Sequence, residues 1–139
     1  MYLLDTNVVS ELRKGTRADA KVRAWADKTP AQLYRLSIIT QLELEIGVLR
    51  MERRDTGQGA ALRQWLEEWV LVFFKGQMLD VDLAVVRRCA ALHVPNPRPE
   101  RDALIAATAL THGLTVVTRD TADFEPMGVA LFNPWLAPG

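Results

Sequence analysis

Tyr2-Leu3-Leu4-Asp5-Thr6-Asn7 and Leu114-Thr115-Val116-Val117-Thr118-Arg119-Asp120 are two short apolar stretches, one near each end of the chain, that both run into an aspartate. Short apolar runs bounded by polar residues are typical of buried parallel strands. In an open parallel sheet, ligands bind just beyond the carboxyl ends of the strands, where the strand order reverses. We therefore expect Asp5 and Asp120 to contribute to one acidic site at the rim of a sheet.

Strand-like and helix-like segments alternate along the rest of the chain, which is the pattern of an α/β sheet. Further strands are expected at 32–37, 77–81 and 129–132, the last at an edge, and helices at 7–14, 17–27, 40–54, 60–74, 100–112 and from a cap at Asp82 to about 92. Two glycines predict a turn at 55–59, and three prolines predict a stiff loop at 95–99. No repeat or linker interrupts the pattern, so we expect one α/β domain over residues 1–139.

Composition narrows the class of protein. The chain has 139 residues, of which 49% are hydrophobic and 24% charged, and its formal net charge is zero. Bulk charge therefore gives no sign of a nucleic-acid partner, although local patches could still bind one. The lone Cys89 rules out an internal disulfide and fits a reducing cytosol. No leader-like segment or bilayer-length apolar run is present, which favours an intact cytoplasmic protein without a membrane partner.

Four carboxylates, taken singly, each have a structural explanation. Asp5 could cap the first helix, and Thr40-Gln41-Leu42-Glu43 fits a capping box in which Glu43 turns back to the helix start. Asp102 lies in the first turn of its helix, where the helix dipole favours an acid. Asp120 could begin the turn 120–123. The residues alone leave a structural and a functional reading open for each of them.

Taken together, the four carboxylates point to a metal site. Each is expected at a strand's carboxyl end or in a helix's first turn, and thus on one rim of the sheet. Two negative charges about 5 Å apart repel by roughly 3 kcal/mol at an effective dielectric near 20, so such a cluster calls for a cation. Oxygen ligands suit Mg²⁺ or Mn²⁺. A thiolate or imidazole site is disfavoured, because Cys89 has no spaced partner and His93 and His112 are isolated.

The motifs that carry these carboxylates resemble those of a known family. Tyr2 to Ser10 resembles the start of the PIN-domain ribonucleases of the VapC toxin group, and three further signatures and a tail follow in the family's order. These are Thr40 to Gly47, Asp102 to Ala109, Leu114 to Asp120 followed by Asp123-Phe124, and Phe132-Asn133-Pro134-Trp135, the last being similar to the Fit-type branch. The resemblance covers nearly the whole chain. Asp120 stands where many members have Asn, which puts extra charge at the fourth position.

The resemblance implies a fold, an activity and a set of site residues. The fold would be an α/β/α sandwich with a central, mainly parallel sheet flanked by helices. Asp5, Glu43, Asp102 and Asp120 would bind one or two Mg²⁺ or Mn²⁺ ions, with Asp123 at a less constant acidic position. The reaction would be hydrolysis of RNA phosphodiester bonds by a water whose pKa the metal lowers. The residues implied to hydrogen-bond the ligands or the phosphate are Thr6, Asn7 and Thr118, although Asn7 could equally continue the first helix cap. Arg119 sits beside the proposed site, where it could bind a phosphate of the substrate or simply be a solvated cation.

The same resemblance implies partners. A cognate VapB-type antitoxin would lie across helices 17–27 and 40–54, where Trp25, Leu42, Ile46 and Leu49 could line a groove or simply pack in the core. The toxins of this group usually dimerise, and they reach operator DNA only through the antitoxin. The alternative function is a non-catalytic subunit of such a complex that acts in operator binding and autoregulation. A phosphatase with Asp5 as nucleophile is disfavoured, because Asp5-Thr6-Asn7 lacks the second aspartate of an Asp-x-Asp pair.

Overall fold

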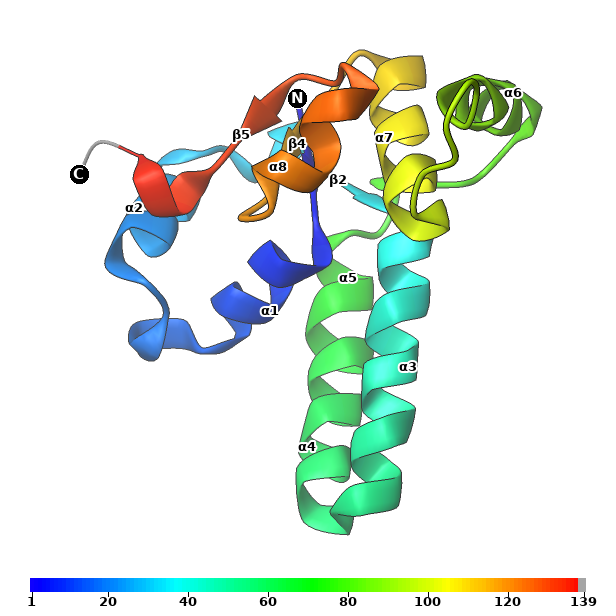
Figure 1. Cartoon of the computed structure of the whole chain (residues 1–139). Coiled ribbons are helices and arrows are strands. Elements are labelled where there is room, and N and C mark those ends of the chain that lie inside the picture. Colours follow the sequence, from blue (N-terminus) through cyan, green and yellow to red (C-terminus); the bar gives the residue numbers. More distant parts are fainter. Residues whose placement is uncertain (138–139) are drawn as a thin grey trace.

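The computed structural model describes residues 1–137 and contains a five-stranded sheet in the order β3-β2-β1-β4-β5 (Figure 1). The strands are β1 (Tyr2–Leu4), β2 (Tyr34–Ser37), β3 (Met78–Leu79), β4 (Thr115–Val117) and β5 (Leu131–Phe132). All four neighbouring pairs run parallel. Each predicted strand is confirmed in a shorter form, and β5 lies at an edge as expected. The strand from the start of the chain and a strand from its end, β1 and β4, are neighbours in the centre.

Eight α-helices connect and cover the strands. They are α1 (Thr6–Arg13), α2 (Ala20–Lys28), α3 (Ile38–Arg54), α4 (Thr56–Trp65), α5 (Leu71–Phe73), α6 (Leu83–Leu92), α7 (Glu100–His112) and α8 (Thr121–Phe124). Four 3₁₀ turns, η1 (Gly15–Arg17), η2 (Ala31–Leu33), η4 (Glu125–Met127) and η5 (Pro134–Leu136), and a π-helical segment, η3 (Leu66–Val70), complete the chain as far as it is described. Asp82 caps α6 as predicted, since its side chain accepts a hydrogen bond from the Val85 amide at 3.0 Å. Across residues 1–137, none of these helices has the length and apolarity that crossing a membrane requires.

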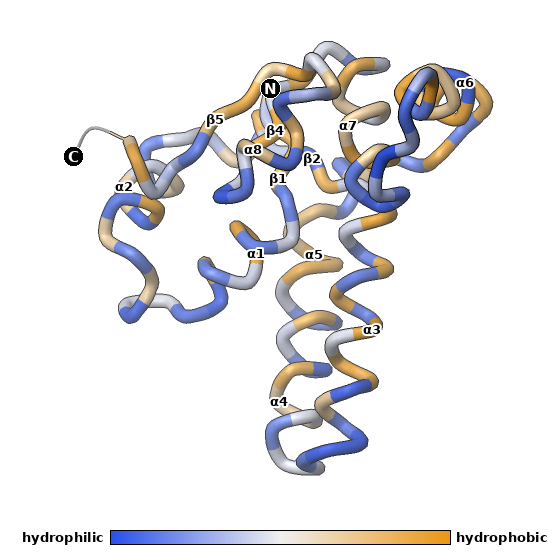
Figure 2. The backbone as a smooth tube through the Cα atoms, viewed as in Figure 1, coloured by the Kyte–Doolittle hydropathy of each residue, from blue (hydrophilic) through white to orange (hydrophobic). Residues whose placement is uncertain are grey.

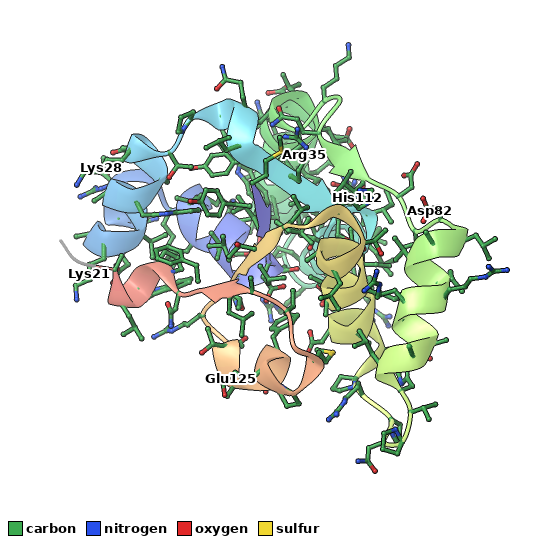
Figure 3. All side chains as sticks on the ribbon, turned by 90° about the horizontal axis from the view of Figure 1, so that it is seen from above. Lys21, Lys28, Arg35, Asp82, His112 and Glu125 are labelled. Atoms are coloured by element: carbon green, nitrogen blue, oxygen red, sulfur yellow. The ribbon has the colours of Figure 1, made fainter. Side chains whose placement is uncertain are left out.

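Two hydrophobic cores lie on opposite faces of the sheet, because successive strand residues point to opposite sides. Leu3 and Val116 belong to the core under α6 and α7, whereas Leu4 and Val117 belong to the core under α1, α3 and η3. Figure 3 shows α7 between the sheet and α6, with His112 at the end of α7 and Asp82 at the start of α6. The strands are apolar at successive positions because both faces are covered. The predicted α/β/α architecture is confirmed.

Helices α3 and α4 form a long hairpin that projects from the sheet (Figure 1), with hydrophilic residues at its tip (Figure 2). The predicted turn at 55–59 is wrong. Only Asp55 lies between the helices, and its side chain accepts a hydrogen bond from the Gln58 amide at 3.0 Å, which starts α4 at once. Gly59 lies inside α4, where a Cβ would stand 2.4 Å from the Cα of Glu52 on α3. Gly59 therefore allows the two helices to approach each other closely, and it does not form a turn.

Candidate active site

The carboxyl ends of β1 and β4 bring Asp5 and Thr118 together. Leu4 pairs with Val117 in the parallel register, and the Asp5 amide donates to the Val117 carbonyl at 2.9 Å. The Thr118 hydroxyl then donates to Asp5 Oδ2 at 2.8 Å, and both side chains are buried. Two residues 113 positions apart in the sequence are therefore held in direct contact by the sheet.

Asp5 also caps α1, so the structural role predicted for it is confirmed, and the same carboxylate bonds to Thr118. The Thr6 amide donates to Asp5 Oδ1 at 2.9 Å, and the Asp5 backbone is extended (φ −73°, ψ 159°), as an N-cap residue requires. The cap engages one carboxylate oxygen and Thr118 engages the other. These two bonds fix the plane of a carboxylate that is only 7% exposed.

Asn7 links the start of α1 to the loop after β4. Its side-chain amide donates to Asp120 Oδ2 at 3.0 Å and to the Thr118 hydroxyl at 3.3 Å, and its Oδ1 accepts from the Arg119 amide at 3.3 Å. The Asp120 amide donates to the same Thr118 hydroxyl at 3.0 Å. Asn7 also donates to Asp5 Oδ2 at 3.5 Å, so it links Asp120 and Thr118 to the cap residue, and none of its side-chain bonds is to the helix backbone.

Glu43 reaches the site from α3. Its Oε1 accepts a hydrogen bond from the Thr6 hydroxyl at 2.7 Å, and Arg101 Nη1 lies 3.8 Å from its Oε2. The predicted capping box is wrong, because α3 begins at Ile38 and the side chain of Ser37 is its cap. Glu43 consequently lies in the second turn, where its side chain is free to turn toward α1. Arg101 was missed by the sequence analysis, since nothing in the spacing of residues 43 and 101 indicates contact.

Asp102 lies in the first turn of α7, where the charges of the other carboxylates act on its pKa. Burial is the main cause that raises its pKa above the ordinary value, and the charges of Asp123, Glu43 and Asp120 raise it further. Its side chain is half-buried and accepts no hydrogen bond from any residue between 1 and 137. Asp123 is exposed on α8. The five predicted acidic residues therefore lie close enough for their charges to act on one another.

Burial also raises the pKa of Asp5, to about 6. The hydrogen bonds from Thr118 and Thr6 act in the opposite direction, and the charges of Asp102 and Glu43 add to the rise. A carboxylate with two good donors normally has a low pKa. Its raised value shows that burial and like charge outweigh those donors, so the protein alone does not neutralise this rim.

The donor set fits a hard divalent ion by its chemistry. All the candidate ligands are carboxylates, and Asp102 is a half-buried acid for which a cation would supply the missing partner. Among residues 1–137, no three acidic, histidine or cysteine side chains lie close enough together to hold an ion directly.

Arg119 lies on the Asp120 side of the site and is braced by the C-terminal segment. Its guanidinium carbon lies 5.2 Å from the centroid of the Trp135 ring, and its carbonyl accepts from the Asn133 side chain at 3.4 Å. The charged group itself is exposed. The tail thereby fixes a cation beside the carboxylates while leaving it accessible.

The residues predicted to line a partner groove lie apart from the apolar cavity that opens in this structure, and their role in a groove stays a prediction. A cavity of about 410 Å³ opens between α1, α2 and the η3–α5 segment, with Trp69 and Phe73 in its wall. Trp25 packs instead against Tyr2 and Phe132, with ring centroids 5.4 Å apart in both pairs. The α3 residues Leu42, Ile46 and Leu49 do not line the cavity, and Leu42 and Leu49 are exposed.

Comparison with known proteins finds a matching family and several similar proteins. The model of the PIN domain family matches residues 2–128. VapC ribonuclease Y4jK of Sinorhizobium fredii is 39% identical over 97% of this chain and 98% of its own length, and Toxin FitB of Neisseria gonorrhoeae is 38% identical over 97% and 99%. The solved structure of FitAB bound to the IR36 DNA fragment superposes with a TM-score of 0.89 and 34% identity, covering 100% of this chain and 99% of that one.

Proposed function

The chain belongs to the PIN-domain family, and from that premise we propose that it is a Mg²⁺-dependent endoribonuclease, the toxin of a type II toxin–antitoxin pair. The observation that carries the proposal is Asp5, a buried carboxylate whose pKa is raised to about 6 although the Thr6 amide and the Thr118 hydroxyl donate hydrogen bonds to it. A site with a buried carboxylate of raised pKa at its centre is suited to binding a cation. We further propose that residues 1–139 act as one PIN domain in the cytoplasm.

The ion would be held by Asp5, Glu43, Asp102 and Asp120, with Asp123 acting from farther out, and Mn²⁺ could replace Mg²⁺. When bound, it supplies charge stabilisation for the phosphodiester and lowers the pKa of the attacking water. In the hydrolysis, a bond forms between the water oxygen and phosphorus, one P–O ester bond breaks, and a proton passes to the leaving oxygen.

The chain's own residues orient the reacting groups. Thr118 and Thr6 hold Asp5 and Glu43 through the hydrogen bonds of 2.8 and 2.7 Å. Asn7 holds one oxygen of Asp120 at 3.0 Å, which leaves the other oxygen of this exposed side chain to orient water. Arg119 binds an RNA phosphate as an exposed guanidinium held over Trp135.

We also propose the partners of this site. The relative FitAB binds DNA as a complex, and by analogy this chain pairs with a VapB-type antitoxin, forms a homodimer and reaches operator DNA through the antitoxin. The apolar cavity with Trp69 and Phe73 in its wall is a suitable seat for an amphipathic antitoxin helix. The antitoxin holds the nuclease inactive by covering the site.

Cleavage of RNA by the antitoxin-free protein tests the activity. Wild type should cut single-stranded RNA in Mg²⁺ and stop in EDTA. Asp5→Asn should lower the rate by more than about a hundredfold, because loss of residues that merely support a metal ligand costs roughly 10–100-fold. Asp80→Asn is the matched control and should cut like wild type, because Asp80 is exposed after the edge strand β3, two strands from β1, and its charge does not act on Asp5 or Asp102. Equal cleavage by Asp5→Asn would refute the proposed site.

A second candidate function is a non-catalytic subunit that serves only in operator binding. The DNA-bound FitAB relative favours it. It predicts that the antitoxin-free protein leaves RNA intact in both Mg²⁺ and Mn²⁺, while the complex with antitoxin still binds operator DNA. RNA cleavage that disappears in Asp5→Asn would eliminate it.

A further inference from the structure

A second cavity opens directly beside Glu43. It has a volume of about 300 Å³ and lies between α1, α3 and α4. Its wall includes Thr6, Ser10, Arg13, Glu43, Gly47 and Trp65. Because Thr6 and Glu43 also belong to the candidate active site, where their side chains are hydrogen-bonded at 2.7 Å, the cavity is continuous with that site.

Arg13 supplies the positive charge of this cavity. It lies on the same face of α1 as Thr6 and Ser10, about 10 Å along the helix axis from Thr6. Its guanidinium carbon lies 5.7 Å from the centroid of the Trp65 ring, and the Trp65 ring stacks in turn on Trp69, at 6.3 Å and 10° between planes. Arg13 is exposed and forms no ion pair with any residue from 1 to 137. It is a cation held in place without a carboxylate to neutralise it.

Gly47 keeps the cavity open. It lies in the interior of α3, where glycine is less favourable than alanine, and its φ angle is in the ordinary helical range. A Cβ at this position would meet no atom within 4 Å. Packing therefore does not require glycine here, and any longer side chain would enter the space beside Glu43 and Trp65.

We propose that this cavity is a subsite for an RNA phosphate next to the scissile one, with Arg13 as its phosphate-binding residue and Trp65 as the support that orients Arg13. The proposal rests on the ribonuclease function. A polyanion must be held against a rim of carboxylates by a chain with zero net charge, so local cations have to supply the attraction. Arginine laid on an aromatic ring is a common element of single-strand binding. Arg119 and Arg13 would grip the strand on the two sides of the carboxylates.

The test is the affinity of a fluorescein-labelled single-stranded RNA, measured by anisotropy in EDTA over a series of KCl concentrations. Arg13→Ala should weaken binding about three- to fivefold, as expected for one exposed ion pair. The slope of log affinity against log salt should become shallower by about 0.7, the value for one single-strand phosphate contact. Arg13→Lys should keep the slope. Arg87→Ala, which removes an exposed arginine on α6, is the matched control and should change neither quantity.

Two substitutions of Gly47 distinguish an effect of the cavity on RNA binding from an effect on the stability of the fold. Gly47→Ala should raise the melting temperature and Gly47→Leu should preserve the fold, yet both should weaken RNA binding, Leu more than Ala. If wild type binds and cuts RNA while Arg13→Ala keeps the same affinity and salt slope, the subsite is refuted and the ribonuclease function stands, even if Arg13→Ala weakens antitoxin binding. If wild type neither binds nor cuts RNA, the ribonuclease function itself is refuted.

Discussion

At the scale of single residues, the hydroxyl of Thr118 joins the two chain segments that form the site. It donates to Asp5 Oδ2 at 2.8 Å and accepts from the Asp120 amide at 3.0 Å, with no exposure to solvent. Thr118→Val keeps the shape and removes these two bonds and the one that the hydroxyl accepts from the Asn7 side chain at 3.3 Å, which leaves a buried carboxylate oxygen and an amide without these partners. We expect a loss of about 1–3 kcal/mol in the free energy of unfolding, measured with urea.

The same substitution should raise the pKa of Asp5 further, because the Thr118 hydrogen bond lowers it in the wild type. An NMR titration of the Asp5 carboxyl carbon in metal-free protein measures this. Thr118→Ser, which retains the hydroxyl, is the control and should leave the Asp5 pKa close to that of wild type. A Val variant that titrates like the Ser variant would show that the hydroxyl does not hold Asp5.

The raised pKa of Asp5 predicts a pH dependence of stability. The pKa lies at about 6 in the folded chain against 3.8 for an unperturbed aspartate, so the folded state binds the proton more tightly and the stabilisation is present at low pH. It is lost as the pH rises from about 4 through 6, by roughly 3 kcal/mol, since one pKa unit corresponds to about 1.4 kcal/mol. Urea unfolding in EDTA should show a larger fall in wild type than in Asp5→Asn, which retains only the smaller contribution of Asp102, whose pKa is also raised. Parallel curves for the two proteins would contradict it.

The sequence revealed the acids of the site more readily than their partners. Asp5 and Asp120 follow apolar strands, so their place at a rim could be predicted from strand ends alone. The bond from Thr6 to Glu43 and the bond from Asn7 to Asp120 join residues 37 and 113 positions apart. Such contacts are fixed by the order of strands in the sheet, which no local pattern encodes. The spacing of Thr6, Ser10 and Arg13 on one helix face was a usable signal for Arg13.

At the scale of elements, the α3–α4 hairpin depends on Gly59. A Cβ there would stand 2.4 Å from the Cα of Glu52, and a backbone atom cannot move aside as a flexible side chain can. Gly59→Ala should therefore lower the free energy of unfolding by about 1–3 kcal/mol despite the better helix propensity of alanine. Gly57→Ala is the matched control, because its Cβ would meet only Asp55 Oδ1 at an ordinary 3.6 Å. Equal stability of the two variants in urea would refute the packing argument.

The errors in the predicted elements have one cause. Residues 55–59 contain two glycines and read locally as a turn, and Thr40 with Glu43 reads locally as a helix start. In the structure, packing of α4 on α3 makes Gly59 helical, and Ser37 at the end of β2 starts α3 before Thr40. Tertiary contacts override local preference wherever the two conflict. The elements whose apolar pattern was long, such as α7, were predicted correctly.

At the scale of the whole molecule, the two cores are joined by the sheet, and the acidic rim lies where β1 and β4 end between them. The rim is electrostatically unfavourable without a cation, as the raised pKa values of Asp5 and Asp102 indicate. An ion that binds only the folded chain stabilises it by about 2.7 kcal/mol at a hundredfold excess over its dissociation constant. For a chain of this length we expect the melting temperature to rise by roughly 8 °C.

This stabilisation by Mg²⁺ should be larger at pH 8 than at pH 5, because protons compete with the ion for Asp5 below its pKa of about 6. Asp102→Asn should melt at a higher temperature than wild type in EDTA, since a half-buried charge is gone, and should gain little from Mg²⁺. Asp80→Asn should respond to Mg²⁺ as wild type does. Differential scanning calorimetry of the three proteins at both pH values measures all of these effects. An equal rise at the two pH values, or an undiminished rise in Asp102→Asn, would mean that the ion binds away from the rim.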